Sequence, residues 1–355
     1  MKVLREWTID APWGKIAMIS WGNEAGLPVL LVHGRQDSAA TFEPLLQLLP
    51  DSYHYVALDL PGHGRSDPFP TGVMPTRLHF VGAVHLHGAY EMQPRWHHSC
   101  AGKVEIIVRD VYTGRFVREE IASRVCSLCV DLAIECNDIE PNMCFFIKIL
   151  HDKISNKFCY FPGLFFNAVY PHRISKMILL DPGPALSRLQ VHDPQEYFAS
   201  FHQKYYDNYD KFAQKRIYSK QRALEAVMKA RGFTEAQARL ALSRNMVKVG
   251  EDLYELSWDR RLICLPPPNY PPSYYYQLFY TPTPTLLIAA KEFQGGYTNG
   301  VKKTLKLISD LEKSLDSFTV VTVEGGHDVH FTNPERFIKV LCEFLDKKFE
   351  CKSRL

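Results

Sequence analysis

The sequence is short of the features that mark several broad protein classes. Its 42 lysine and arginine residues nearly balance its 39 aspartate and glutamate residues, for a formal net charge of +3. This balance gives no reason to expect nucleic acid as a partner, because nucleic-acid-binding domains carry a basic surplus. No apolar run approaches the roughly 18 residues that a membrane-spanning helix needs, so no membrane span is expected. The first ten residues, MKVLREWTID, lack the apolar stretch of a secretory signal.

The chain is instead rich enough in apolar residues to form a large core. It has 355 residues, of which 46% are hydrophobic and 23% charged, a composition typical of folded globular proteins and not of disordered chains. Six of the nine cysteines fall between residues 100 and 159. Without a secretory signal they are interpreted as reduced thiols. The spacing of Cys126, Cys129, Cys136 and Cys144 matches no common zinc ligand set, so neither a metal nor a cofactor is expected.

The hydrophobic pattern predicts a mostly parallel sheet flanked by helices. A hairpin is expected in the first 25 residues. Apolar runs that suit buried strands alternate with segments of helical spacing, as in proteins built from strand–helix–strand units. The expected strands are 28–34, 53–60, 174–181, 285–290 and 318–323, and a last helix is expected over 334–349.

Residues 185–281 differ from this pattern and predict a helical cap inserted between two strands of the sheet. Residues 221–242 are rich in Ala, Arg and Gln at helical spacing, and a proline- and tyrosine-rich stretch follows at 266–276. The core is then formed by 1–184 and 282–355, with 74–163 as an atypical insert or replaced segment. The tyrosines suggest an apolar or aromatic-lined pocket, but ordinary packing of the cap on the core is the favoured explanation for them.

Four motifs, in order along the chain, carry a family resemblance. They are PVLLVHG, LDLPGHGRSD, ILLDPGP and VEGGHD. In these the sequence resembles the α/β-hydrolases, and most of all the serine hydrolase-like family of that fold. The resemblance covers 1–73 and 164–355 and leaves out the stretch between them.

The resemblance implies roles for several residues. Gly34 and Arg35 follow the first buried strand, where the family places the backbone N–H of an oxyanion hole. His327 lies in the loop of the general base, with His330 as its competitor. The acid that orients the base is expected to be Asp181, because the usual position directly after the strand that ends at residue 290 has no Asp; Glu292 is the alternative. His63 in the PGHGRS loop is expected to be structural.

The nucleophile is the missing part. The family signature is Gly-x-Ser-x-Gly at a turn from strand to helix, and no serine of this chain has glycine on both sides at that spacing. Ser99 is the candidate for a degraded form of the motif, and the neighbouring Cys100 could attack through its thiolate. Ser155 or Cys159 could instead have taken over near the expected position. The remaining alternative is that no nucleophile exists, through natural loss or a mis-joined gene.

Two functions from different classes therefore stay open. The first is hydrolysis of an ester, thioester or related carbonyl compound through an acyl-enzyme, with an apolar acyl or aromatic small molecule as substrate. The second is a catalytically inactive protein that binds through the same fold. An aspartate nucleophile, as in epoxide hydrolases, is disfavoured because no Asp lies at such a turn.

The last three residues form a possible targeting signal. Ser353, Arg354 and Leu355 resemble the carboxyl-terminal tripeptide that the peroxisomal import receptor reads. The expected location is peroxisomal or cytoplasmic.

Overall fold

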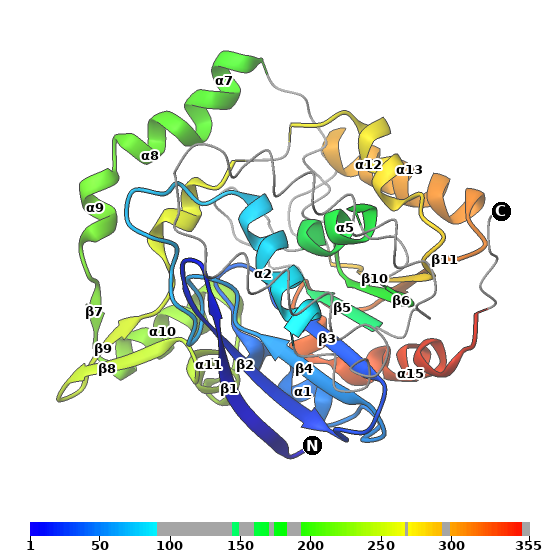
Figure 1. The fold of residues 1–355 in the computed structure, drawn as a ribbon, viewed down its shortest axis with the longest axis horizontal. Coiled ribbons are helices and arrows are strands. Elements are labelled where there is room, and N and C mark those ends of the chain that lie inside the picture. Colours follow the sequence, from blue (N-terminus) through cyan, green and yellow to red (C-terminus); the bar gives the residue numbers. More distant parts are fainter. Residues whose placement is uncertain are drawn as a thin grey trace, which may run out of the picture.

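The structure is a computed structural model, and it describes residues 1–90, 144–148, 160–169, 174–182, 193–266, 269–292 and 299–349. Within these residues, eight strands form one sheet with the order β1-β2-β4-β3-β5-β6-β10-β11 (Figure 1). The strands are β1 (Val3–Ala11), β2 (Gly14–Gly22), β3 (Pro28–Val32), β4 (His54–Leu58), β5 (Cys144–Lys148), β6 (Lys176–Leu180), β10 (Thr285–Ala290) and β11 (Phe318–Val323).

The sheet is antiparallel at one edge and parallel elsewhere. The predicted hairpin is β1 with β2, and β2 pairs antiparallel with β4; all the pairs from β4 to β11 are parallel. The predicted strands near 28, 53, 174, 285 and 318 are confirmed, because continuous apolar runs such as Val29-Leu30-Leu31-Val32 are buried on both faces of a parallel sheet. Strand β5 was not predicted, and it lies in the centre of the sheet between β3 and β6.

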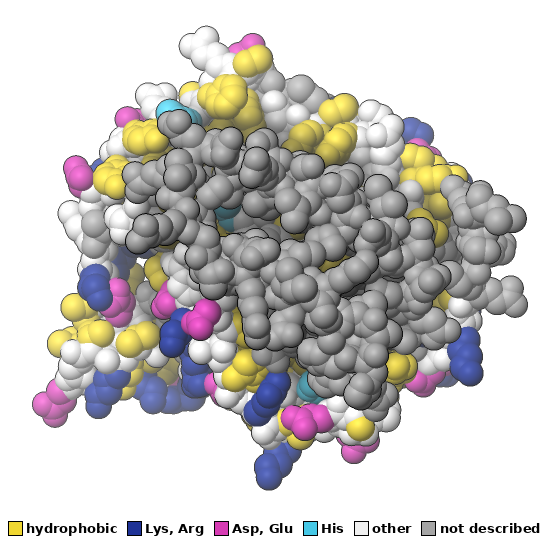
Figure 2. All heavy atoms as spheres, in the orientation of Figure 1, with side chains coloured by type: hydrophobic (Ala, Val, Ile, Leu, Met, Phe, Trp, Pro, Cys, Tyr) yellow, Lys and Arg dark blue, Asp and Glu magenta, His cyan; other side chains and the backbone are white. Residues whose placement is uncertain are grey.

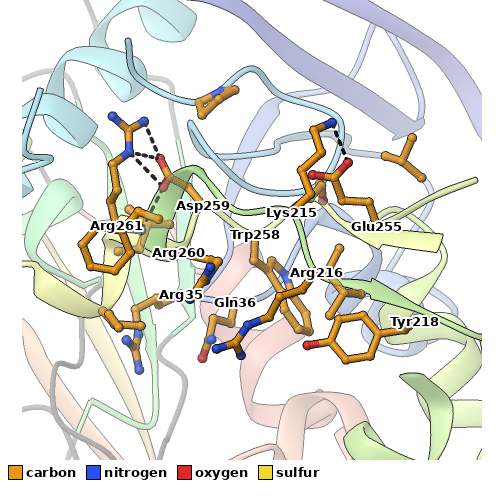
Figure 3. Close-up of a pocket in the computed structure, with 18 of the residues that line it drawn as sticks. Arg35, Gln36, Lys215, Arg216, Tyr218, Glu255, Trp258, Asp259, Arg260 and Arg261 are labelled. Carbon is orange, nitrogen blue, oxygen red and sulfur yellow. Dashed lines mark hydrogen bonds and ion pairs between the residues drawn. The ribbon is translucent and has the colours of Figure 1, made fainter. Parts of the chain in front are cut away.

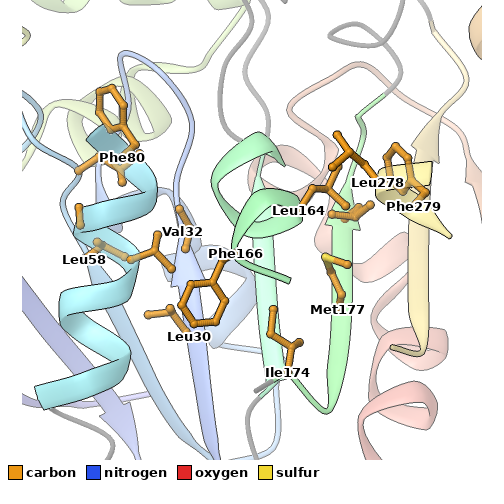
Figure 4. Close-up of a cluster of buried hydrophobic side chains, with 14 of the residues drawn as sticks. Leu30, Val32, Leu58, Phe80, Leu164, Phe166, Ile174, Met177, Leu278 and Phe279 are labelled. Carbon is orange, nitrogen blue, oxygen red and sulfur yellow. The ribbon is translucent and has the colours of Figure 1, made fainter. Parts of the chain in front are cut away.

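Helices cover both faces of the sheet. One face packs against α2 (Arg77–Tyr90), α5 (Tyr160–Val169), α12 (Pro272–Phe279) and α13 (Asn299–Ser314). Leu30 and Val32 point to this side and meet a buried cluster that includes Phe80 and Phe166 (Figure 4). Val29 and Leu31 point to the opposite side, because successive strand residues alternate.

The opposite face is covered by shorter elements. These are η1 (Ala39–Phe42), α1 (Glu43–Leu46), α14 (Val329–Thr332), η4 (Pro334–Arg336) and α15 (Ile338–Asp346). The predicted last helix is therefore divided: η4 begins at Pro334, and the α-helix that follows ends at Asp346.

The segment between β6 and β10 contains a second small sheet. Its helices are α7 (Pro194–Phe198), α8 (Lys204–Tyr206), α9 (Tyr209–Ala213), α10 (Lys220–Arg231) and α11 (Glu235–Leu242), with helical turns η2 (Ala199–Gln203) and η3 (Arg260–Cys264). The strands β7 (Ile217–Tyr218), β9 (Leu253–Leu256) and β8 (Met246–Gly250) form an antiparallel sheet in that order. We refer to residues 193–281 as the cap.

Sequence signals end one cap helix and begin the next. The predicted helix 221–242 is two helices, since Gly232 adopts a left-handed φ of 69° at the end of α10. Thr234 then caps α11, and its side chain and that of Gln237 form a reciprocal capping box.

A buried ion pair joins the cap to the core. Asp59, at the end of β4, is fully buried and accepts hydrogen bonds from Arg244 Nε and Nη2 at 3.0 and 2.9 Å. Gly64 approaches the Asp59 carboxylate so closely that a Cβ atom there would lie 2.2 Å from its carbon. The Gly64 N–H donates to Asn245 of the cap at 3.0 Å. The PGHGRS loop is thus a docking point for the cap.

Candidate active site

The candidate site lies at one edge of the main sheet. Strands β3, β5, β6, β10 and β11 run parallel, so their carboxyl ends meet at the same edge. Side chains that follow different strands are therefore close in space, although they are far apart in sequence. Arg35, Asp181 and His327 come from three such loops, after β3, β6 and β11.

Asp181 is held at the end of β6 by neighbouring backbone. Its N–H donates to the Ile288 carbonyl at 2.7 Å, and its Oδ1 accepts from the Ala290 N–H at 3.0 Å. Its φ is +48°, a left-handed conformation that Asp tolerates better than most residues. The carboxylate is almost completely buried and fixed in direction.

His327 meets Asp181 through a short hydrogen bond. His327 Nδ1 lies 2.5 Å from Asp181 Oδ2, and the exposed fractions of the two side chains are 6% and 4%. With Nδ1–H donating to the carboxylate, the basic lone pair of a neutral imidazole is on Nε2. The structure therefore brings together the two residues that the sequence predicted as base and acid.

The loop of His327 depends on a glycine. Gly325 has a φ of +119°, and a Cβ atom there would lie 2.7 Å from Arg336 Nη1. The helix α14 begins two residues after His327 and is buried through Val329 and Phe331. The imidazole thus sits between a tight turn and an anchored helix.

The loop after β3 is held by His33. Its Nε2 accepts from the Leu60 N–H at 2.9 Å, and its Nδ1 donates to the Gly34 carbonyl at 2.6 Å. Gln36 has a φ of +58°, so the chain turns sharply just after Gly34 and Arg35. Arg35 is buried. This geometry places the Gly34–Arg35 backbone at the carboxyl end of β3, where the sequence predicted an oxyanion hole.

A cap arginine connects two of these loops, and sequence reasoning missed it. Arg231, the last residue of α10, donates from Nη2 and Nε to the Asp328 carboxylate at 2.6 and 3.1 Å. Its Nη1 lies 3.9 Å from Asp37 Oδ1 in the loop after β3. Phe233 packs against Phe331 of α14 in a tilted arrangement, with ring centroids 4.9 Å apart. The cap therefore contacts both the loop of His327 and the loop of Arg35.

The other histidines and the alternative acid lie elsewhere. Glu292 is exposed after β10. His330 is buried with Nε2 3.3 Å from Thr41 Oγ1, on the face of the sheet covered by α1 and α15. His63 lies against His33 and Phe80, and burial lowers its pKa well below the usual 6.5, helped by the neighbouring His33 and Arg35. It is a neutral packing residue in the PGHGRS loop, as the sequence predicted.

The end of β5 lies between two of these loops. Lys148, the last residue of β5, pairs with Leu180 of β6, and Ile147 pairs with Val32 of β3. The carboxyl end of β5 is therefore flanked by the strands that precede His33 and Asp181. The next described element along the chain is α5, which begins at Tyr160. The four nucleophile candidates from the sequence, Ser99, Cys100, Ser155 and Cys159, lie outside the described residues.

A cleft of about 1050 Å³ opens between the core and the cap; it reaches the site at Arg35, whereas Asp181 and His327 do not line it. Arg35 and Gln36 line it from the core, and the helices and strands of the cap line the opposite side (Figure 3). The tyrosines at 270–276 do not line it. Tyr275 is buried in the core cluster instead, and Tyr274 and Tyr276 pack against it. These tyrosines therefore pack the cap on the core.

The described residues contain no group of three or more His, Cys, Asp or Glu side chains that could hold a metal. Of the cysteines weighed as zinc ligands, only the backbone of Cys144 is described, at the start of β5. No helix in the described part of the chain is long and apolar enough to cross a membrane.

Comparison with known proteins places this arrangement in a class. No family model matches the chain. Among solved structures, a hypothetical protein of Pseudomonas aeruginosa has a TM-score of 0.64 at 17% identity, covering 96% of this chain and 98% of that one. The thioesterase domain of the curacin biosynthetic pathway has a TM-score of 0.60 at 16% identity, with coverages of 95% and 98%. An esterase of Mycobacterium tuberculosis has a TM-score of 0.57 at 16% identity, covering 97% and 92%. The chain therefore has the α/β-hydrolase fold.

Within that fold, the relatives by sequence confirm the resemblance to the serine hydrolase-like proteins. The serine hydrolase-like protein of Danio rerio is 25% identical over 362 residues, which cover 96% of this chain and 88% of the relative. The human serine hydrolase-like protein is 44% identical over 71 residues, which are 20% of this chain and 35% of the human protein. That stretch thus spans about a third of the human relative.

Proposed function

We propose that the chain hydrolyses an ester, thioester or related carbonyl compound through an acyl-enzyme. The observation that carries this proposal is the 2.5 Å hydrogen bond between His327 Nδ1 and Asp181 Oδ2 at the edge of the sheet beside Gly34 and Arg35. A buried carboxylate that fixes the tautomer of an imidazole is the base–acid half of a catalytic triad. The esterase and thioesterase among the similar structures are in line with this reaction class.

The residues act in a defined order. His327 Nε2 takes the proton of the nucleophile as it attacks the substrate carbonyl carbon. Asp181 holds the imidazole and stabilises the imidazolium that forms. The backbone N–H groups after β3 donate to the carbonyl oxygen as it becomes negative. The imidazolium then gives its proton to the leaving alcohol or thiol. Water, deprotonated by His327, then attacks the acyl carbon; the bond to the nucleophile breaks, the acid is released, and the imidazolium returns its proton to the nucleophile.

We propose that the nucleophile lies among residues 149–159, between β5 and α5 in the sequence. Ser155 is the hydroxyl and Cys159 the thiol of that segment. The proposal is supported by the position of β5, whose end pairs with the strand that precedes Asp181, because a triad nucleophile must be within hydrogen-bond reach of the base. Ser99 follows none of the described sheet strands directly, since the nearest preceding described element is α2. It stays a prediction from the local sequence.

The test is covalent labelling. A fluorophosphonate probe reacts with an activated serine, and mass spectrometry of the digested protein identifies the modified peptide. We expect an adduct on the peptide that contains Ser155, lost in His327→Ala; a thiol-directed electrophile examines Cys159 in parallel. An adduct on Ser99 would support the proposed activity but identify Ser99, and not Ser155, as the nucleophile. Absence of any adduct that depends on His327 would favour the inactive binding protein.

The proposed location is the peroxisome, with Ser353, Arg354 and Leu355 as the signal. A fluorescent protein fused ahead of the chain would colocalise with a peroxisomal marker. The same fusion without the last three residues would become diffuse.

A further inference from the structure

The cleft between the core and the cap is lined by more positive than negative side chains. Seven lining residues are cationic and three are acidic. The cations are Arg35, Arg65, Lys215, Arg216, Arg231, Arg260 and Arg261, and the acids are Asp67, Glu255 and Asp259. In the space-filling view, basic side chains also gather at the lower left, over the cap sheet of β8 and β9 (Figure 2). A site built for a purely apolar substrate has no need of this excess.

Several of these cations are already neutralised by carboxylates. Lys215 pairs with Glu255 at 2.8 Å, and Arg261 pairs with Asp259 at 2.7 Å. Arg65 likewise pairs with a glutamate of β1 at 2.5 Å. Arg231 binds the aspartate that follows His327. These four residues have structural partners and do not need a ligand.

Arg216 and Arg260 differ from these four. In the part of the chain that the structure describes, no carboxylate pairs with either of them. Both hydrogen bonds that Arg260 makes there use Nη1, which donates to the carbonyl oxygens of Lys211 and Gln214. The N–H groups of Nη2 and Nε are available to another acceptor. Figure 3 shows both arginines at the cavity beside Gln36 of the loop after β3.

The two guanidinium groups affect one another electrostatically. Burial, and after it the charge of Arg216, lowers the pKa of Arg260 below its ordinary value. Two like charges at a cavity wall without a counter-charge repel, and an anion between them relieves that repulsion. Guanidinium groups suit carboxylate and phosphate in particular, because their N–H donors match two oxygens at once.

We propose that Arg216 and Arg260 bind a carboxylate or phosphate group of the substrate on the cap side of the cleft. The scissile carbonyl then lies on the core side, at the loop of Gly34 and Arg35. This inference rests on the proposed hydrolase function, and it replaces the apolar substrate expected from the sequence with an anionic one. The anionic group is distant from the reacting bond and serves to orient the substrate.

The test compares two substrates that differ only in this charge. The p-nitrophenyl ester of glutaric acid carries a free carboxylate, and the corresponding p-nitrophenyl methyl diester does not. We expect kcat/KM to be higher for the charged ester. In Arg216→Gln, and in the double variant with Arg260→Gln, the ratio of charged to neutral kcat/KM falls by about 10-fold or more, the effect of losing a charge-assisted hydrogen bond. Equal ratios in the wild type and both variants would overturn the proposal.

The matched control is Arg239→Gln. Arg239 is a cap arginine that pairs with Glu235 on the surface of α11 and does not line the cleft. Its removal changes the charge of the cap equally, so a non-specific charge effect would lower the ratio in this variant as well. A fall of the same size in Arg239→Gln would contradict a site at Arg216 and Arg260.

A binding measurement separates this proposal from the proposed reaction. Glutarate and inorganic phosphate are titrated into the full chain by calorimetry, which requires no catalysis. Binding that is weakened about 10-fold in Arg216→Gln, and not in Arg239→Gln, supports the anion site even if neither ester is hydrolysed. Hydrolysis of the neutral ester with no binding of either anion would overturn the site and leave the hydrolase intact. The tighter of the two anions identifies the group that the substrate carries.

Discussion

The ion pair between Arg244 and Asp59 should be a large contributor to stability. Asp59 is fully buried and the Arg244 side chain is 4% exposed. Replacing Arg244 by Ala leaves a buried carboxylate without its cation, which typically costs about 3–5 kcal/mol. The Asp59 carboxylate would still accept the N–H groups of Ala39 and Arg65, at 2.7 and 2.9 Å. We therefore expect the lower end, about 3 kcal/mol.

The assay is urea unfolding followed by tryptophan fluorescence and circular dichroism. The control is Arg239→Ala, whose exposed i,i+4 pair with Glu235 should contribute only about 0.3–0.5 kcal/mol. In a double-mutant cycle, Asp59→Ala and Arg244→Ala should couple by more than about 1 kcal/mol, because each removes the partner of the other. A loss for Arg244→Ala within about 0.5 kcal/mol of the control would refute the reasoning, since surface changes have that size.

Four further perturbations test other parts of the account. Gly64→Ala should lower the free energy of unfolding far more than Gly232→Ala, since the new Cβ meets a buried carboxylate at the first position and nothing within 4 Å at the second; equal urea midpoints would contradict this. Burial lowers the pKa of His63 below its unfolded value, so the unfolded state binds the extra proton and stability falls as pH drops below about 6.5. In His63→Gln the loss of stability between pH 7 and 5 should therefore be smaller; an unchanged slope would mean that His63 is not the group that titrates. Arg231→Gln should lower kcat more than it raises KM, because it frees the loops of Asp328 and Asp37 that Arg231 joins. An unchanged kcat would show that the contacts of Arg231 are only structural. Asp181→Asn should reduce the rate by about 10⁴-fold with the fold intact by circular dichroism, because the amide favours the wrong imidazole tautomer; a rate near the wild type would exclude Asp181 as the orienting acid.

The sequence predicted the parts of the fold that local patterns control. The strands β3, β6, β10 and β11 are short apolar runs that end in a polar residue or glycine, and such runs suit a buried parallel sheet. Strand β5, Cys-Phe-Phe-Ile-Lys, was missed because its five residues lie in a stretch whose other sequence matches no expected element. The cap sheet was missed because β7 has only two residues and β8 shows no buried face.

The candidate site, too, was predicted only in part from the sequence. The partnership of Asp181 and His327 followed from a family resemblance, and the structure shows the hydrogen bond between them. The ion pair of Arg231 with Asp328 joins residues 97 positions apart, and no periodicity or motif marks such a contact in one sequence. The charge of the cleft was likewise invisible, since its cations come from the loop after β3, the PGHGRS loop and separate parts of the cap.

The most direct test of the central claim is fluorophosphonate labelling of the full chain, with the adduct mapped by mass spectrometry. We predict one modified serine, in the peptide between β5 and α5 that contains Ser155, with labelling lost in His327→Ala and strongly reduced in Asp181→Asn. A folded protein that takes up neither the fluorophosphonate nor a thiol-directed label at Cys159, or that labels equally with and without His327, would contradict a hydrolase built on the His327–Asp181 pair.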